Sequence, residues 1–123
     1  MGKLLFWISF YSLMLGFSQI LLKLGINRIG SFSAKTAGDI FALLLTAVKN
    51  PYIIFGTLLM ASSYFLWMAI LSWFKLSIAF PLTAMGFVFV ALLSYFLLGE
   101  KLLLFNYLGI GLIAVGIFLL LYK

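Results

Sequence analysis

The stretch "LLLFNYLGIGLIAVGIFLLLY", residues 102–122, decides the fold of this protein because it is long, apolar and free of charge. A helix that crosses the hydrocarbon layer of a membrane needs about 20 such residues at a rise of 1.5 Å each. The sequence therefore predicts a membrane-spanning helix here, and the rest of the chain must be searched for similar stretches.

The composition of the whole chain favours lipid over water as its surroundings. Of the 123 residues, 67% are hydrophobic and 8% are charged. A soluble domain carries about 25% charged residues, and one of this length cannot hide so much apolar surface. A soluble domain is therefore excluded.

The sequence predicts an all-α integral membrane protein in which residues 1–123 form one membrane domain. Residues 39–50 are apolar but too short to cross, so we expect a short helix at the membrane interface or a lead-in to the second span. Residues 25–38 are polar and rich in turn formers, and they are expected to form a loop. The four predicted spans are residues 4–24, 52–73, 79–98 and 102–122.

Two prolines stand where the second and third spans are expected to begin. Pro51 directly precedes the second span, and Pro81 is close to the start of the third. Proline has no backbone N–H, so it fits the first turn of a helix, where that group has no partner. We expect Pro81 to mark the start of the third span or a hinge there.

The basic residues occur singly near the ends of the apolar runs, and the net charge is +6. This pattern is typical of helices anchored to lipid phosphates. Nucleic-acid binding needs a basic patch with interleaved aromatic residues, which the sequence lacks. Four spans put both termini on one side of the membrane, but the charge difference between the two sides is too small to decide the orientation.

The sequence offers little to an enzyme. It contains no cysteine and no histidine, which excludes a thiol nucleophile, a disulfide and a histidine-based metal site. Its only acidic residues, Asp39 and Glu100, are far apart along the chain. No glycine-rich phosphate loop is present. We therefore expect no catalytic residues, no metal and no cofactor.

Small residues recur in the last span. Gly109 and Gly116 are seven residues apart, which is about two helical turns, so they share a face, and Gly111 is nearby. Such a face lets two helices approach closely in lipid, either within the chain or between the two chains of a dimer. Glycine is also common in membrane helices that have no such contact.

Three stretches together resemble the drug/metabolite transporter superfamily, in its small four-span (EamA-like) members. Within it, the sequence is most similar to the paired subunits that flip undecaprenyl-phosphate-aminoarabinose across the bacterial inner membrane. Gln19 followed by Lys23, the stretch 78–81 and Glu100 match motifs of those subunits. The stretches are "SQILLKLG" at 18–25, "LSIAFPLTAMGFVFVALLSYFLLGEKL" at 76–102 and "LGIGLIAVGIFLL" at 108–120.

The resemblance implies an inner-membrane flippase subunit that pairs with a second four-helix subunit, identical or similar. It implies an anionic substrate, a sugar or aminosugar linked to undecaprenyl phosphate. Small multidrug resistance proteins share the layout but carry a glutamate in the middle of the first span, where this chain has Leu15. Because the layout is shared, export of cationic drugs or other small molecules is the alternative function, although the glutamate is missing. A non-transporting membrane scaffold subunit is a third hypothesis.

Lys23 lies about 30 Å of helix from Lys3, close to the interface, where it either anchors the helix to the headgroups or binds a substrate phosphate. Gln19 is one turn earlier on the same face and can hydrogen-bond to a sugar or phosphate oxygen. Glu100 either pairs with a lysine, binds the amine of an aminosugar, or anchors a turn. The other candidates are Arg28, which adds positive charge, and Ser63, Tyr64 and Trp67, which offer hydroxyls and an aromatic surface.

Overall fold

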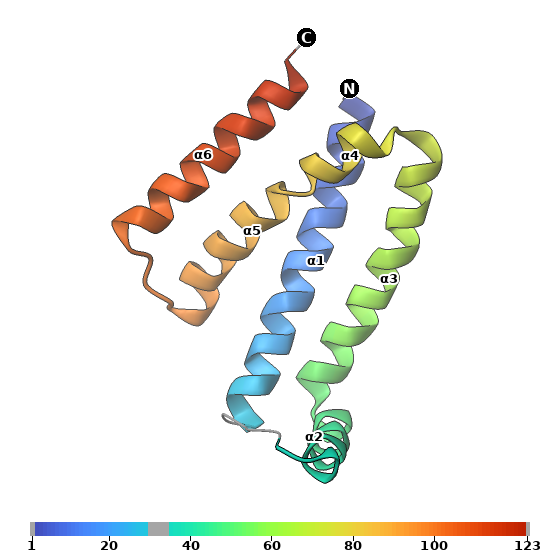
Figure 1. Ribbon diagram of the computed structural model, residues 1–123, viewed down its shortest axis with the longest axis vertical. Helices are drawn as coiled ribbons and strands as arrows, with labels where there is room; N and C mark the ends of the chain where they lie inside the picture. Colours follow the sequence, from blue (N-terminus) through green and yellow to red (C-terminus); the bar gives the residue numbers. More distant parts are fainter. Residues whose placement is uncertain (1, 30–34, 123) are drawn as a thin grey trace.

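The structure, a computed structural model, describes residues 2–29 and 35–122 as a bundle of helices (Figure 1). The predicted all-α membrane fold with four spans is confirmed. Met1, Lys123 and residues 30–34 of the expected loop lie outside the described residues. The four stretches long and apolar enough to cross a membrane are α1 (Gly2–Ile29), α3 (Pro51–Trp73), the composite stretch Leu76–Leu98 and α6 (Leu104–Leu121).

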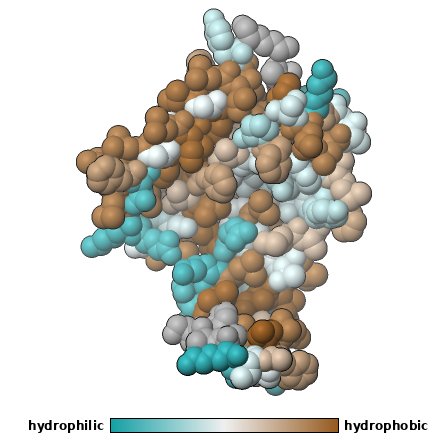
Figure 2. Space-filling view, in the orientation of Figure 1, coloured by the Kyte–Doolittle hydropathy of each residue, from teal (hydrophilic) through white to brown (hydrophobic). Residues whose placement is uncertain are grey.

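α1 is the central helix of the bundle. It packs along α3 and against the third span, and its first residues lie at the same end of the molecule as the end of α6 (Figure 1). Leu4 and Ile8 are four residues apart on one face of α1, and they meet Ile70 of α3 in a small buried core. Elsewhere most large apolar side chains are exposed, and hydrophobic residues cover most of the face in Figure 2. A surface of this kind suits lipid.

α1 continues to Ile29 and so replaces the first part of the loop expected at residue 25. Contacts with the start of α3 account for the difference. The Asn50 side-chain amide donates to the Gly25 carbonyl at 3.1 Å, and a Cβ at Gly25 would overlap the Ile53 side chain. Tertiary contacts thus stabilise a polar helical turn that local sequence preference assigns to a loop.

α2 (Ala37–Lys49) lies across the end of the bundle, and Figure 1 looks along its axis. It begins with a capping box, in which Thr36 Oγ1 accepts from the Asp39 N–H at 3.3 Å and the Asp39 carboxylate accepts from the Thr36 N–H at 3.2 Å. Its exposed apolar residues recur with helical spacing on one face. They are Ile40, Phe41, Leu44, Leu45 and Val48.

The third span is a composite of α4 (Leu76–Leu82), α5 (Met85–Leu93) and the π-helical segment η1 (Ser94–Leu98). It begins at Leu76 rather than at residue 79, so part of the stretch between the second and third predicted spans is helical. Pro81 lies inside α4 instead of in its first turn. The N–H that Pro81 lacks would bond to a carbonyl four residues earlier, within α4. α4 ends one residue after Pro81, and a turn leads to α5; in this turn the Thr83 N–H donates to the Phe80 carbonyl at 3.0 Å and the Ala84 N–H to the Pro81 carbonyl at 3.1 Å.

Gly99 ends η1 with φ of 68°, in the left-handed region that glycine enters without strain. The chain then reverses, and the Glu100 N–H donates to the Ser94 carbonyl at 3.3 Å. This turn places Glu100 beside the end of the third span.

Candidate functional site

A cavity of about 640 Å³, the main cavity, lies between α1 and the third span. Two rows of side chains form its walls. On α1 the row recurs every four residues, and on the third span it recurs every three or four, so each row follows one helix face. The α1 row is Tyr11, Leu15 and Gln19, and the opposite row is Phe80, Thr83, Phe87, Val90 and Ser94.

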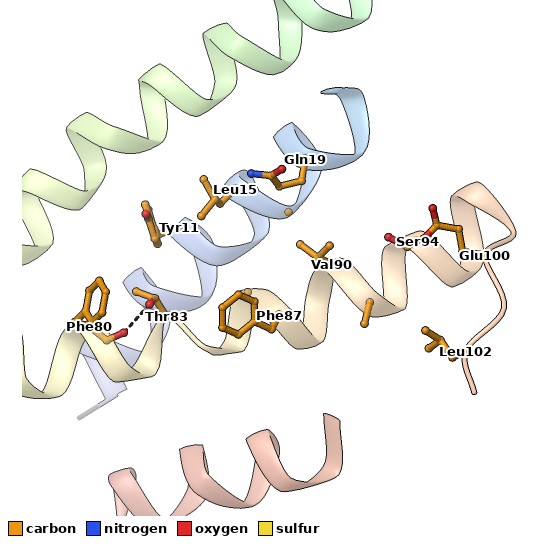
Figure 3. Close-up of a pocket in the computed structure, with 13 residues that line it drawn as sticks. Tyr11, Leu15, Gln19, Phe80, Thr83, Phe87, Val90, Ser94, Glu100 and Leu102 are labelled. Carbon is orange, nitrogen blue, oxygen red and sulfur yellow. Dashed lines mark hydrogen bonds between the residues drawn. The ribbon is translucent and has the colours of Figure 1, made fainter. Parts of the chain in front are cut away.

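Polar groups gather at one end of the main cavity. Figure 3 shows Gln19, Ser94 and Glu100 at this end, and Tyr11, Phe80 and Thr83 at the other. Leu15 and Phe87 lie between them in the same view and give the middle an apolar lining, and Val90 lies level with Gln19.

Lys23 continues the α1 row beyond Gln19. It lines an adjoining cavity of about 290 Å³, which shares Gln19, Ser94 and Glu100 with the main cavity. We call Gln19, Lys23, Ser94 and Glu100 the polar end. The structure thus brings together three candidates that the sequence places in two separate segments.

Ser94 is a member of the polar end that the sequence analysis missed. It is 9% exposed, and its carbonyl accepts the hydrogen bond that holds the turn at Glu100. A signal was present, because Ser94 interrupts the apolar run of the third span shortly before Glu100. A lone serine in a membrane helix nevertheless satisfies its hydroxyl within the helix in most cases, which made the signal weak.

Trp67 of α3 supports the opposite, aromatic end from behind. Its ring lies 5.2 Å from that of Tyr11 with 30° between the planes, and 6.3 Å from that of Phe80. Both partners line the main cavity, whereas Trp67 itself does not. Trp67 therefore acts on the cavity through the two rings that it positions.

The other two candidates on α3 lie elsewhere. Ser63 is 1% exposed, and its hydroxyl donates to the Met60 carbonyl at 2.6 Å. Tyr64 is 61% exposed and packs its ring against Phe65 at 6.2 Å. Neither lines the main cavity.

Arg28 is also separated from Lys23. It lines a third cavity, of about 410 Å³, with residues of α2 and the start of α3. Its guanidinium lies 4.5 Å from the centroid of the Tyr52 ring and donates to the Tyr52 hydroxyl at 3.2 Å. The positive charges expected to act together are thus divided between two cavities.

The glycines of α6 face open space. Apart from its chain neighbours and the adjacent backbone of α6, a Cβ added at Gly109, Gly111 or Gly116 would have no described atom within 4 Å. The predicted helix contact at these glycines is therefore not made by the described residues of this chain, and contact with another chain stays a prediction. No group of three acidic, histidine or cysteine residues suited to a metal occurs in residues 2–29 and 35–122.

Two curated proteins are similar to this chain, and both are named as a probable 4-amino-4-deoxy-L-arabinose-phosphoundecaprenol flippase subunit ArnE. The protein of Pectobacterium atrosepticum is 28% identical over 99 residues, which are 77% of this chain and 88% of the relative. The chain is similar to flippase subunits. The ArnE protein of Hamiltonella defensa is 36% identical over 65 residues, or 53% of this chain and 59% of that relative.

The similarity to the ArnE proteins confirms the resemblance to aminoarabinose flippase subunits that the sequence motifs indicated. No family model matches the chain. No solved structure matches it either.

Proposed function

We propose that the chain is one subunit of a flippase that moves a sugar or aminosugar linked to undecaprenyl phosphate across the bacterial inner membrane. The observation that carries the proposal is the polar end, where a lysine, an amide, a hydroxyl and a carboxylate adjoin a cavity with an apolar middle. The names of the two ArnE relatives support the same substrate class.

Each part of such a substrate has a suitable partner in the cavity. The compact ammonium of Lys23 can pair with the phosphate, which in a lipid-linked sugar lies at the interface. Gln19 and Ser94 offer hydrogen bonds to sugar hydroxyls, and the Glu100 carboxylate can pair with the amine of an aminosugar. The apolar lining in the middle of the main cavity suits the isoprenoid chain.

The main cavity also provides a route into the membrane. Tyr11 lies twelve residues from Lys23 on α1, which is about 18 Å along the helix axis. That distance exceeds half of the hydrocarbon thickness of about 30 Å. The Tyr11 and Thr83 hydroxyls offer hydrogen-bonding partners at the far end, so a headgroup would meet polar groups at both ends of the groove.

Export of a cationic drug has less support. Leu15 lines the main cavity at the position where the small multidrug resistance proteins carry their glutamate. Among the described residues that line the main cavity, Glu100 is the only acidic one, and Lys23 adjoins it. A cationic drug would therefore be repelled by the positive charge of Lys23, and it would find no carboxylate deep in the membrane.

We propose that the subunit carries out no chemical step. Glu100 has no second carboxylate beside it in the two cavities of the polar end, so paired acid–base chemistry lacks a partner. Asp39 caps α2 and is used structurally.

We also propose that the subunit works as a dimer, homomeric or with a similar four-helix chain, through the glycine face of α6.

The decisive experiment measures binding of a short-chain polyprenyl phosphate to the purified protein and to Lys23→Gln. An ion contact of 4 Å at an effective dielectric of 20 contributes about 4 kcal/mol before desolvation. If a third of this remains, Lys23→Gln weakens binding about tenfold. Lys75→Gln, which removes a charge from the opposite end of the bundle, is the control and should bind like the wild type.

Two outcomes would overturn the proposal. Equal affinity of the wild type and Lys23→Gln would return Lys23 to the role of an interfacial anchor. No binding by the folded wild type, alone and paired with a second subunit, would favour the scaffold hypothesis instead.

A further inference from the structure

The third cavity, which we call the basic cavity, lies where the end of α1, the last turn of α2 and the start of α3 meet. Its volume is about 410 Å³. Two of the described residues that line it are cationic, Arg28 and Lys49, and none of those described is acidic; the others are Ile29, Thr46, Asn50 and Pro51. Two like charges in one cavity without a carboxylate favour an anion as the occupant.

Contacts with α3 hold Arg28 in place. The guanidinium lies over the Tyr52 ring at 4.5 Å and donates one hydrogen bond, of 3.2 Å, to the Tyr52 hydroxyl. An arginine has five N–H donors, so this bond leaves most of them for a ligand. Because the stacked guanidinium is already oriented, binding an anion costs little further side-chain order.

Asn50 fixes the frame around the two cations. Its amide N–H donates to the Gly25 carbonyl of α1 at 3.1 Å, and its side-chain oxygen accepts from the Tyr52 N–H at 3.0 Å. One side chain therefore ties the end of α1 to the start of α3 directly beside the basic cavity. The backbone that carries the two cations is thus fixed, and the Arg28 side chain is held as well, through Tyr52.

The depth of the basic cavity matches lipid phosphates. Arg28 lies five residues beyond Lys23, or about 7.5 Å further along α1. If Lys23 lies at the edge of the hydrocarbon, Arg28 lies at the outer boundary of the headgroup layer, which is about 5–7.5 Å thick on each side, and its long side chain reaches the phosphates. The exposed apolar face of α2, which lies across the bundle end, suits the same layer.

The basic cavity is distinct from the polar end. Five residues turn a helix by about 500°, so Arg28 and Lys23 point in directions about 140° apart. Among residues 2–29 and 35–122, none lines both the basic cavity and either cavity of the polar end. One bound molecule therefore does not have to satisfy both cations.

We propose that the basic cavity binds the phosphate of an anionic membrane lipid, with Arg28 as the oriented donor and Lys49 as the second charge. The lipid is a structural ligand, separate from the transported substrate. It joins α2 to the ends of α1 and α3 and holds α2 at the membrane surface. Thr46, whose hydroxyl donates to the Ala42 carbonyl at 2.9 Å, keeps oxygen lone pairs for a headgroup hydroxyl.

The test counts lipids bound to the purified protein by native mass spectrometry in a mild detergent. Phosphatidylglycerol, phosphatidylcholine and inorganic phosphate are titrated separately into the wild type and into Arg28→Gln/Lys49→Gln. We expect the wild type to prefer phosphatidylglycerol to phosphatidylcholine, and the double variant to bind phosphatidylglycerol at least tenfold more weakly. The matched control is Lys35→Gln/Lys101→Gln, which removes two charges from the same membrane side outside the basic cavity.

Further variants keep the test decisive. Arg28→Lys retains the charge and should bind more weakly than the wild type but more strongly than the double variant, which addresses any loss of fold in the latter. Lys23→Gln should retain the lipid, so the lipid site and the substrate site stand or fall separately. Equal phosphatidylglycerol binding by the double variant and its control would overturn the proposal. A site that binds inorganic phosphate but shows no preference for phosphatidylglycerol would be a free-anion site, which also overturns it.

Discussion

Tyr11 of α1 and Trp67 of α3 form an aromatic pair, 5.2 Å between centroids, and only Tyr11 of the two lines the main cavity. The pair therefore connects α3, which does not wall the cavity, to the groove between α1 and the third span. Trp67 thus packs behind Tyr11 and restricts the movement of its ring at the aromatic end of the cavity.

Trp67→Ala should weaken binding of a polyprenyl phosphate by up to about tenfold, because an aromatic pair contributes about 0.5–1.5 kcal/mol beyond its buried area. The loss should depend on the isoprenoid chain and be small for a phosphate carrying a short alkyl group. Titration of both ligands measures this difference. Tyr64→Ala is the control, since Tyr64 is exposed and away from the cavity; an equal loss in both variants would contradict the role of Trp67.

Glu100→Gln should reduce affinity for a polyprenyl-phosphate aminosugar while leaving affinity for the matching neutral sugar unchanged. A carboxylate pairs with an ammonium group more strongly than an amide does, and the expected loss is about tenfold. Competition between the two sugars on wild type and variant measures it. If both sugars lose affinity equally, the Glu100 carboxylate does not recognise the amine.

Leucine at both Gly109 and Gly116 should separate a dimer into single subunits in detergent. The two glycines share one face of α6, and leucine side chains would keep a partner helix at a greater distance. Light scattering of the purified protein gives the mass. Gly111→Leu is the control because Gly111 is turned about 200° from Gly109, and an unchanged mass of the double variant would place the interface elsewhere.

The capping box of α2 should make the stability of the protein depend on pH in the acidic range. Hydrogen bonds from the Lys35 N–H, the Thr36 side chain and the Thr36 N–H hold the pKa of Asp39 below its ordinary value of 3.8. A carboxyl with a lowered folded pKa stabilises the fold above its unfolded pKa, and this contribution is lost as the pH falls through the folded pKa. Asp39→Asn should therefore lower the Tm at pH 7.

The same comparison at pH 3 supplies the check. Below the ordinary pKa of 3.8 the unfolded chain takes up a proton at Asp39, so the charge contributes less to stability and the Tm difference from Asp39→Asn should shrink. Glu100→Gln, measured in parallel, controls for the general effect of losing an acidic residue. A difference that stays constant from pH 7 to pH 3 would contradict the role of the Asp39 charge.

The fold could be predicted largely because each span is a long and mostly apolar run, and lipid leaves few alternatives to a helix for such a run. Gln19 and Lys23 could be recognised as one row because a spacing of four defines a helix face. The continuation of α1 to Ile29 could not be predicted, since it depends on Asn50 and Ile53, which follow much later in the chain.

The candidate site also has features that could be predicted from the sequence and features that could not. Which cavity each cation lines depends on the rotation of α1 against its neighbours, and the sequence alone does not contain that rotation. Arg28 and Lys23 therefore appeared as one positive field although they face different cavities. Pro81 was misplaced because α4 begins five residues earlier, at Leu76, in a stretch that local signals assigned to a connection.

The position of Glu100 depends on the number of residues in the π-helical segment Ser94–Leu98, and not only on which residues they are. A π-helical turn accommodates one more residue than an α-helical turn, and a one-residue deletion converts it to the ordinary form. Such a deletion would rotate whatever follows by about 100°, which would carry Glu100 away from Gln19 although every functional side chain is still present. Length in this segment therefore constrains evolution and engineering of the polar end as strictly as does the chemistry of its members.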